Sequence, residues 1–373
     1  MSNAHAQQSL RVMISGGGTG GHIFPAIAIA NAVREREATT EFLFVGAEGK
    51  MEMEKVPAAG YRIEGLPIRG LQRGSIVKNL ALPWRLLRSM LKARALVRSF
   101  RPDVAVGVGG YASGPLLAAA QRMGVPTLIQ EQNSFPGRTN IHLAKRAQRI
   151  CVAYAGMDRF FPKEKLLLTG NPVRQEVVRL AGKRPRGMEE FGLQEGRPVL
   201  FITGGSLGAR GINQGVKAAL SGWKAAGIQV IWQTGTPFLA TAQEAVAALD
   251  YDACKVHEFI ARMDLAYAVA DLVVSRAGAM SVSELCLVQK PAILVPLPTA
   301  AEDHQTHNAR ALTDRGAAVL LRDADAIGQL GPTVSSLILD STALERLRLA
   351  IAGSGTQNAA EAIAAEVIRL ART

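Results

Sequence analysis

The fold is indicated first by residues Leu10–Pro25, which have the sequence LRVMISGGGTGGHIFP. An apolar run ends here in six small residues, five of them glycine, and a helix-like AIAIANAV segment starts directly after Pro25. A strand, a tight glycine turn and a helix in this order point several backbone N–H groups at one spot. The stretch therefore predicts a binding site for an anion or for the oxygens of a sugar.

The same pattern occurs again about half the chain later, in Pro198–Gln214, with the sequence PVLFITGGSLGARGINQ. Two copies indicate two similar α/β halves. Open parallel sheets bind ligands beyond the carboxyl ends of their strands, where such a glycine loop lies. We therefore expect each half to present a glycine loop to a ligand.

Apolar runs that alternate with helical periodicity predict doubly wound parallel sheets in both halves. In the first half, further strands are expected at 41–46, 125–133, 151–155 and 166–169, with a strand and a second glycine loop at 102–114. In the second half, they are expected at 229–233, 254–259, 271–275, 291–295 and 317–321.

The predicted domain organisation follows from these elements. A disordered tail at 1–9 precedes an N-terminal domain at 10–170, and a second domain occupies 198–355. The region 171–197 between them contains several Pro, Gly and charged residues and is the expected linker. The closing segment 356–373 contains an amphipathic helix, which we expect to pack back toward the N-terminal domain.

The distribution of charge indicates an anionic partner. The net charge is +12, and Arg69–Arg101 contain nine Lys or Arg residues and no Asp or Glu. Apolar residues and a tryptophan are interleaved with these charges, a combination that docks on anionic membrane surfaces. The alternative is a solvated helix whose leucines face the core. Nucleic acid is disfavoured because no helix-turn-helix, RNP or zinc-finger pattern accompanies the charge. The predicted membrane residues are Ile76, Leu80, Trp84, Arg85, Arg88 and Lys92.

Cysteine spacing and hydropathy disfavour several other classes. The three cysteines lie far apart without a CxxC pair, which indicates neither a disulfide framework nor a zinc site and is typical of a reducing cytosol. No apolar run approaches the roughly 18 residues that span a bilayer, and the N-terminus lacks the pattern of a signal peptide. The sequence therefore predicts a protein inside the cell, peripheral to the membrane.

Two sequence patterns could indicate a dinucleotide site and a metal site, but the residues around them favour other interpretations. Gly16, Gly18 and Gly21 match the dinucleotide pattern G-x-G-x-x-G, but the strand at 41–46 lacks the terminal acid that holds the ribose hydroxyls. The D-x-D triplets at 250–252 and 323–325 could hold a divalent metal, but we expect them to begin or end helices. No cofactor and no metal are therefore predicted.

Two further segments of the second half could bind a polar ligand. Arg276–Glu284, RAGAMSVSE, follows a predicted strand, and its small residues let backbone N–H groups approach a ligand. Glu284 could accept hydrogen bonds from two vicinal hydroxyls, although an ordinary solvated glutamate is the alternative. Pro296–Asn308, PLPTAAEDHQTHN, is a polar loop with several hydrogen-bonding side chains.

Eight motifs together carry a resemblance to a known family. In chain order they are GGGTGGHIFPA, GGYASGP, EQNSFPG, GNPVR, GGSLGAR, Phe259-Ile260, SRAGAMSVSE and EDHQTHNA. Over essentially the full length they closely resemble the MurG family of UDP-N-acetylglucosamine:lipid I N-acetylglucosaminyltransferases, which act in bacterial peptidoglycan synthesis. Each motif is weak alone, but eight in register are specific.

The resemblance implies a GT-B fold, in which two Rossmann-like domains face a central cleft. It implies an inverting, metal-independent enzyme at the cytoplasmic side of the inner membrane. The enzyme would move GlcNAc from UDP-GlcNAc to the 4-hydroxyl of the muramyl sugar of lipid I, giving lipid II. A transferase with another UDP-sugar or lipid acceptor, and a non-catalytic nucleotide-binding module, are the alternatives.

The resemblance also implies roles for individual residues. The backbone at Ile260 would contact uracil, Glu284 the ribose diol, Ser206 and Arg174 the diphosphate, and His304 and Gln305 the GlcNAc hydroxyls. The start of the following helix would line the donor pocket through Ala279, Met280, Ser281, Val282 and Ser283. From the other domain, the donor sugar would be reached by Thr19, Gly20, Gly21 and Asn133. The acceptor diphosphate would be held by Gly17, Gly18, Gly109, Gly110, Tyr111 and Ser113.

His22 is the predicted general base, because an inverting transfer removes a proton from the attacking hydroxyl and imidazole titrates near neutral pH. A histidine that only caps its helix or binds substrate is the alternative, and Glu131 is the rival base. Two positions depart from the family pattern: Gln130 replaces the His of HEQN, and Leu207 replaces the Gln of GGSQGA. Gln130 cannot act as an acid or base, and Leu207 removes a side-chain contact with the donor.

Overall fold

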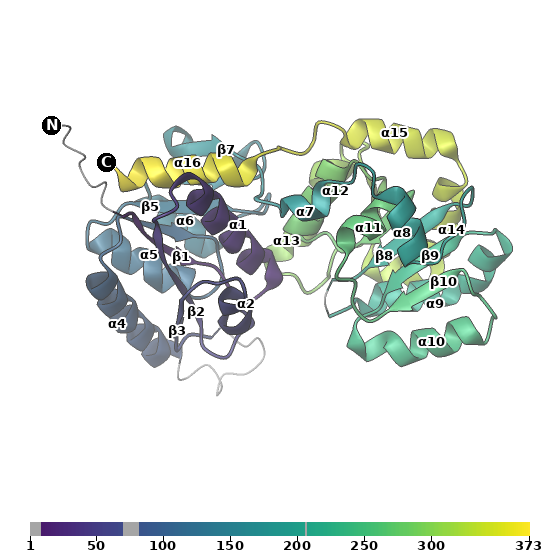
Figure 1. Cartoon of the computed structure of the whole chain (residues 1–373), viewed down its shortest axis with the longest axis horizontal. Helices are drawn as coiled ribbons and strands as arrows, with labels where there is room; N and C mark the ends of the chain where they lie inside the picture. Colours follow the sequence, from purple (N-terminus) through teal and green to yellow (C-terminus); the bar gives the residue numbers. More distant parts are fainter. Residues whose placement is uncertain (1–8, 70–81, 206) are drawn as a thin grey trace. The chain divides into compact units, whose positions relative to one another are not determined.

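The structure is a computed structural model that describes residues 9–69, 82–205 and 207–373. The chain divides into two compact units, one formed by Met1–Arg174 with Asn358–Thr373 and the other by Gln175–Gln357. Each unit has a parallel β-sheet covered by helices (Figure 1). The predicted α/β class with two Rossmann-like sheets is therefore confirmed.

The first unit contains a seven-stranded sheet with the order β3-β2-β1-β4-β5-β6-β7. The order in which strands are added reverses between β1 and β4, which are parallel. Open α/β sheets bind ligands at such a switch point. The strands are β1 (Arg11–Ser15), β2 (Glu41–Ala47), β3 (Ile63–Leu66), β4 (Val104–Gly107), β5 (Thr127–Glu131), β6 (Arg149–Val152) and β7 (Leu166–Leu168). The helices are α1 (Gly20–Arg36), α2 (Glu52–Ala58), α4 (Leu82–Phe100), α5 (Ser113–Arg122), α6 (Arg138–Ala144) and α16 (Ala359–Ala371).

The strand register brings the two glycine loops of this unit to the same level. Ser15, the last residue of β1, is paired with Gly107, the last residue of β4. Alternate residues of β1 point to opposite faces of the sheet, so Val12 and Ile14 pack with α1 and α16 while Met13 packs with α4 and α5. Burial of both faces explains the nearly continuous apolar runs of these strands.

The sequence-based prediction missed β3, which extends the sheet beyond β2 through the pairing of Phe44 with Ile63. This strand has only four residues and contains a charged and a glycine position, so its apolar pattern is short.

The C-terminal helix α16 belongs to the first unit, although the chain reaches it only after the second unit. It lies beside α1 (Figure 1). Ile363, Ala364 and Val367 are fully buried against the first sheet, and Glu366 pairs with Arg149 at 3.0 Å.

The second unit contains a six-stranded sheet with the order β10-β9-β8-β11-β12-β13 and a switch point between β8 and β11. Its strands are β8 (Val199–Thr203), β9 (Gln229–Gln233), β10 (Cys254–His257), β11 (Leu272–Ser275), β12 (Ala292–Leu294) and β13 (Val319–Leu320). Its helices are α7 (Gln175–Val178), α8 (Arg184–Glu190), α9 (Arg210–Ala225), α10 (Leu239–Ala247), α11 (Met263–Val269), α12 (Ala279–Val288), α13 (His304–Thr313), α14 (Ala326–Ile338) and α15 (Ser341–Ile351).

Most of the region named as a linker is folded. The short helices α7 and α8 lie within it, and Val177, Met188 and Phe191 are buried in the hydrophobic core of the second unit. The Pro, Gly and charged residues of this region therefore flank a few apolar residues that are buried in the core.

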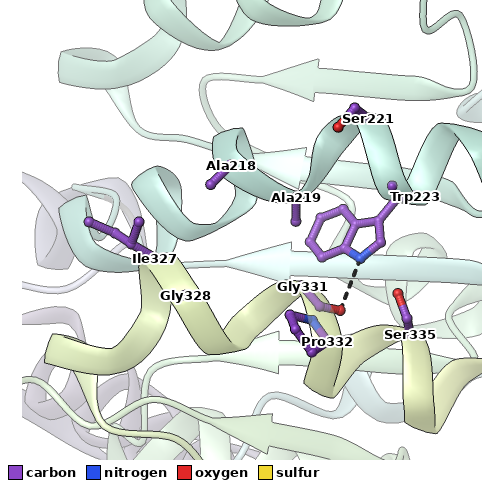
Figure 2. Close-up of a pocket in the computed structure, with 10 residues that line it drawn as sticks. Ala218, Ala219, Ser221, Trp223, Ile327, Gly328, Gly331, Pro332 and Ser335 are labelled. Atoms are coloured by element: carbon purple, nitrogen blue, oxygen red, sulfur yellow. Dashed lines mark hydrogen bonds between the residues drawn. The ribbon is translucent and has the colours of Figure 1, made fainter.

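Small residues let α9 and α14 pack closely on one face of the second sheet. A Cβ atom at Gly331 would lie 3.0 Å from Ala219 Cβ, and Trp223 Nε1 donates to Gly331 O at 3.5 Å. Figure 2 shows the shallow hollow beside this contact, lined by both helices. None of the residues that line this hollow belongs to the candidate site.

Candidate functional site

His22 lies in the first turn of α1, directly after the glycine loop Gly16–Thr19. Its Nδ1 lies 3.1 Å from Gly17 O and 3.3 Å from Thr19 Oγ1. A carbonyl oxygen only accepts hydrogen bonds, so the contact with Gly17 assigns the proton of the neutral ring to Nδ1. Nε2 then carries the lone pair, which is the group that a base uses.

The second glycine loop, at the end of β4, packs against the first. Gly109 and Gly110 have φ of +96° and +87°, a region that favours glycine. A Cβ at Gly109 would lie 2.6 Å from His22 Cδ2, and one at Gly110 would lie 2.3 Å from Gly17 O. The absence of side chains at both positions therefore brings the two predicted acceptor loops and His22 together.

The other two predicted acceptor residues differ in exposure. Tyr111 follows the glycine pair and is 50% exposed, so its side chain is accessible to a ligand. Ser113 begins α5 and is buried, and a Cβ at Gly107 would lie 2.6 Å from its Oγ.

Glu131 ends β5, and both of its carboxylate oxygens accept hydrogen bonds from amides. Oε1 accepts from the backbone N–H of Asn133 at 3.0 Å and from its side chain at 3.2 Å, while Oε2 accepts from Asn140 Nδ2 at 2.8 Å. Burial raises the pKa of Glu131, and the hydrogen bonds from Asn133 and Asn140 oppose this shift. This geometry orients Asn133 and leaves the carboxylate 2% exposed.

Gln130 belongs to a buried amide network. Its Nε2 donates to Asn171 Oδ1 at 3.0 Å, and its Oε1 accepts from Gln132 Nε2. Asn171 Nδ2 in turn donates to Gln132 O at 3.1 Å. The position that departs from the family pattern therefore joins the end of β5 to the GNPVR segment.

Arg174 is the last residue of the first unit, and its guanidinium carbon lies 4.8 Å from the ring centroid of Phe24 in α1. This distance is typical of a cation–π contact. Arg174, which is predicted to bind the diphosphate, thus lies next to the helix that follows the first glycine loop.

In the second unit, the glycine loop between β8 and α9 packs on the end of β9. Gly208 has φ of +74°, and a Cβ there would lie 2.0 Å from Thr234 O. Ser206 lies outside the described residues. Leu207, the second departure from the family pattern, is 80% exposed.

A buried glutamine that the sequence analysis did not name connects this loop with Ile260. Gln233 Nε2 donates to Gly205 O at 3.0 Å, and its Oε1 accepts from the N–H of Ile260 at 2.9 Å. Since this N–H already donates to Gln233, the predicted contact of Ile260 with uracil would use its carbonyl group. The polar residue at the end of the buried strand QVIWQ was the available signal.

The start of α12 follows β11 at the switch point, with Gly278 as its N-cap. Ala279, Met280, Ser281 and Ser283 are partly exposed, whereas Val282 is 1% exposed and lies in the hydrophobic core. Any contact of Val282 with a ligand would therefore use its backbone.

Glu284 is oriented by a tyrosine from α11. Tyr267 is 1% exposed, and its hydroxyl donates to Glu284 Oε2 at 3.0 Å. The sequence analysis did not identify Tyr267, because the contact joins two helices.

The polar segment around the start of α13 is oriented by one further hydrogen bond and by its backbone conformation. Gln305 Oε1 accepts from Leu297 N–H at 2.9 Å, which directs the other end of the amide away from that backbone. His304 begins α13 after Glu302 and Asp303, both with φ of +53°. Polar side chains of this loop are thus held by local backbone geometry.

Arg276, a residue not singled out before, anchors the base of this loop. Its Nη1 donates to Val295 O and Pro296 O, both at 3.1 Å, and pairs with Asp323 Oδ1 at 2.6 Å. Asp323 lies in a short 3-10 turn directly before α14, and Asp250 follows the end of α10 with φ of +48°. The triplet at 323–325 therefore borders a helix as predicted, whereas the triplet at 250–252 lies in the connection between α10 and β10.

The basic segment is described from Leu82 onward, as α4, while Ile76 and Leu80 lie outside the described residues. Trp84, Leu87 and Leu91 are 64%, 49% and 60% exposed and share one helical stripe, since they are three and four residues apart. The core-facing residues are instead Ser89, Ala93 and Val97.

The predicted basic residues of this segment lie on the same helix. Arg85 is partly exposed and Arg88 exposed, and Lys92 pairs with Glu48 at 3.4 Å. In the part of the chain that the structure describes, we find no helix with the length and hydropathy needed to cross a membrane.

Both halves of the chain match domains of known glycosyltransferases. Residues 12–152 match the glycosyltransferase family 28 N-terminal domain, and residues 199–363 match the glycosyltransferase family 28 C-terminal domain. The chain is 51% identical over 371 residues to a UDP-N-acetylglucosamine:N-acetylmuramyl-(pentapeptide) pyrophosphoryl-undecaprenol N-acetylglucosamine transferase of Porphyromonas gingivalis, covering 99% of this chain and 98% of the relative. A transferase of the same name from Bacteroides fragilis is 52% identical over 366 residues, which are 98% of this chain and 96% of the relative.

Solved structures agree with this assignment. The crystal structure of Acinetobacter baumannii MurG is similar with a TM-score of 0.79 and 27% identity, covering 96% of this chain and 99% of that chain. A UDP-GlcNAc 2-epimerase from Neisseria meningitidis, at a TM-score of 0.66 and 12% identity, covers 97% of this chain and all of its own and shares the fold alone. The chain therefore belongs to the family of UDP-N-acetylglucosamine:N-acetylmuramyl-(pentapeptide) pyrophosphoryl-undecaprenol N-acetylglucosamine transferases, and it has their two-domain GT-B glycosyltransferase fold.

Proposed function

We propose that this chain transfers N-acetylglucosamine from UDP-GlcNAc to the muramyl 4-hydroxyl of lipid I, the undecaprenyl-diphosphate-linked MurNAc-pentapeptide, and so forms lipid II. Identity of about half of all residues to transferases of that name, over nearly the whole length of both chains, carries this proposal. The location of both glycine loops at sheet switch points supports it, because ligands of such sheets bind there.

The transfer needs a base that accepts one proton. The 4-hydroxyl oxygen forms a bond to the anomeric carbon, the bond from that carbon to UDP breaks, and the hydroxyl proton goes to His22 Nε2. The contact between His22 Nδ1 and Gly17 O supports this assignment, because it leaves the lone pair of the neutral ring on Nε2. Glu131 would orient Asn133 instead, since both of its oxygens accept hydrogen bonds.

The second unit would bind the donor. The Ile260 carbonyl would contact uracil, and Glu284 would accept hydrogen bonds from the ribose hydroxyls while Tyr267 holds its other oxygen. Gln305, with its Oε1 on Leu297 N–H, would contact the GlcNAc hydroxyls through its amide N–H groups. Ala279–Ser283 and His304 would line the same pocket.

The leaving diphosphate would be stabilised without a metal. α9 has 16 residues, and its N-terminus directly follows the glycine loop that contains Ser206. Backbone N–H groups and the helix dipole favour an anion at such a place. Arg174 would add a positive charge.

The first unit would bind the acceptor at its two packed glycine loops, through the residues from Gly17 to Gly21 and from Gly109 to Ser113. The exposed stripe of α4 would place this unit on the anionic cytoplasmic face of the inner membrane, where lipid I is anchored. Trp84, Leu87 and Leu91 would enter the headgroup region, and Arg85, Arg88 and Lys92 would contact anionic lipids.

The activity is tested by UDP release in the presence of EDTA, with UDP-GlcNAc or UDP-galactose as donor and a lipid I analogue as acceptor. We expect release only with UDP-GlcNAc and acceptor together. Donor binding without turnover would instead identify a non-catalytic module, and turnover with UDP-galactose a different transferase.

The base is tested with His22→Ala. We expect kcat to fall by about 10²–10⁴-fold, the usual contribution of a general base, while the Kd for UDP-GlcNAc stays unchanged. Full activity of His22→Ala, or loss of activity in Glu131→Gln to the same extent, would assign the role elsewhere.

The membrane surface is tested by flotation with anionic vesicles. Replacement of Arg85 and Arg88 by Glu should abolish binding, and binding of the unchanged protein should weaken with salt. The matched control replaces Arg346 and Arg348, on α15 of the second unit, and should bind like the unchanged protein. Equal binding of both variants would exclude this surface.

A further inference from the structure

Glu52 is a buried carboxylate to which neither the family resemblance nor the transfer described above gives a role. It is the first residue of α2 and is 1% exposed. Its Oε1 accepts from Ala47 N–H at 3.0 Å, and its Oε2 accepts from Gly18 N–H at 2.9 Å. Gly18 belongs to the loop before His22, which brings this carboxylate to the candidate site from the neighbouring strand connection.

One peptide group joins Glu52 to His22. The N–H of the Gly17–Gly18 peptide donates to Glu52 Oε2 at 2.9 Å, and the C=O of the same peptide accepts from His22 Nδ1 at 3.1 Å. The two hydrogen bonds lie at opposite ends of one peptide dipole, so each polarises the peptide in the direction that strengthens the other. A carboxylate thus acts on the imidazole without touching it.

Glycines make room for this arrangement. A Cβ at Gly17 would lie 2.2 Å from Glu52 Oε1, and one at Gly46 would lie 2.5 Å from Glu52 Cγ. Gly18 has φ of +87°, a backbone conformation that residues with side chains rarely adopt. The carboxylate therefore fits only against a loop without side chains.

We propose that Glu52 is a positioning residue for His22 and acts through the Gly17–Gly18 peptide, a role that rests on the proposed function of His22 as the base. When His22 Nε2 accepts the proton of the acceptor hydroxyl, the ring becomes positively charged and donates more strongly through Nδ1. The negative charge of Glu52 stabilises this imidazolium across the peptide, and no proton moves to Glu52.

Glu52→Gln separates charge from shape. Glutamine has the same size and can still accept the Gly18 N–H through its side-chain oxygen, but it carries no charge. The matched control is Glu54→Gln in the same helix, where the side chain is 78% exposed. Steady-state kinetics against pH and an NMR titration of the His22 ring, assigned by its absence in His22→Asn, are measured for both variants.

We expect Glu52→Gln to lower kcat about tenfold with little change in the KM for UDP-GlcNAc, and Glu54→Gln to leave both unchanged. A neighbouring anion favours the charged form of histidine, so the acidic limb of the pH profile and the NMR midpoint should both move about one unit to lower pH. The imidazole ¹⁵N shifts should report the Nδ1–H tautomer in the unchanged protein.

An unchanged NMR midpoint in Glu52→Gln would overturn this proposal, even if kcat fell, since a purely structural role predicts lost activity without a titration shift. Failure of the proposed base is visible separately. In that case His22→Asn keeps its activity, while the NMR midpoint still reports whether Glu52 acts on the ring.

Discussion

Tyr267 is a buried residue whose only polar atom serves a residue of the candidate site. Its hydroxyl donates to Glu284 Oε2 at 3.0 Å. Tyr267→Phe removes one of the contacts that orient Glu284, so we expect the KM for UDP-GlcNAc to rise about 3–10-fold, corresponding to the roughly 1 kcal/mol of one hydrogen bond. The kcat value should change little, because the ribose contact proposed for Glu284 is remote from the reacting atoms. Initial rates over a range of donor concentrations check this prediction.

The matched control is Tyr251→Phe. Tyr251 is likewise buried in the second unit, but its hydroxyl donates to the backbone carbonyl of Ile228, away from the candidate site. Its loss should lower stability and leave the donor KM unchanged. An equal rise in KM for both variants would show that Tyr267 acts only through the stability of the unit.

The residue scale also shows what a motif can indicate. The GGGTGGH and GGYASG segments predicted glycine loops, and the structure shows the close approach that makes Gly109 and Gly110 necessary. The hydrogen-bond partners of Glu52 and Gln233 could not be found in this way. Their partners Gly18 and Ile260 lie 34 and 27 residues away in sequence, so only the folded chain brings them together.

At the scale of one element, α4 buries a face of small residues and exposes a face of large ones. Ser89, Ala93 and Val97 contact the core, while Trp84, Leu87 and Leu91 are exposed. Leu96 and Phe100 also pack against the core, so the alternative in which the leucines face the core holds for Leu96 but not for Leu87 and Leu91. The helix therefore packs with little apolar area and leaves a stripe for a partner.

Replacing Trp84, Leu87 and Leu91 together by Ser should abolish binding to anionic vesicles. It should lower the free energy of unfolding by less than about 0.5 kcal/mol per residue, because exposed side chains contribute little to stability. Vesicle flotation and urea denaturation measure the two effects.

The control variant replaces Ile327, Leu339 and Leu349 of the second unit by Ser. These residues are 57%, 58% and 60% exposed, so three apolar side chains of similar exposed fraction are removed elsewhere. Loss of vesicle binding in this control would mean that binding is not specific to α4.

Among the remaining elements, long apolar runs were the most predictable. β9 is fully buried, and its predicted range 229–233 matches its ends. By contrast, β3 and the short helices α7 and α8 have few apolar residues of their own, and they are stabilised by contacts with the sheet and core of their unit. Local sequence does not encode such contacts.

At the scale of the whole molecule, α16 makes the first unit from two separate parts of the chain. Its buried Ile363 packs in the same hydrophobic cluster as Cys151. Burial raises the pKa of Cys151, Cys254 and Cys286 to about 12 each. All three thiols should therefore resist alkylation until the unit that contains them unfolds.

This arrangement gives a test of the division into units. Ile363→Ala removes buried methyl groups from the first unit and should cost about 2–5 kcal/mol there. In increasing urea, Cys151 should then be alkylated at a lower concentration than in the unchanged protein, while Cys254 and Cys286 keep their midpoints. Mass spectrometry of alkylated peptides measures all three.

Ile338→Ala in α14 is the matched control, because Ile338 is also buried but belongs to the second unit. It should lower the urea midpoint of alkylation for Cys254 and Cys286 and leave the midpoint of Cys151 unchanged. A common shift of all three thiols in both variants would show that the chain unfolds as one cooperative body.

The order of apolar runs and glycine turns was enough to predict two parallel α/β sheets with glycine loops, because strand burial and glycine turns are local properties of the chain, while the family was identified through the resemblance of eight motifs. Tertiary structure alone decided which polar groups contact the residues of the candidate site: Glu52 contacts Gly18, Gln233 contacts Ile260, and Tyr267 contacts Glu284. The physical reason is that a buried carboxylate, amide or hydroxyl must find its hydrogen-bond partner in space, and parallel sheets bring together residues that are distant in sequence.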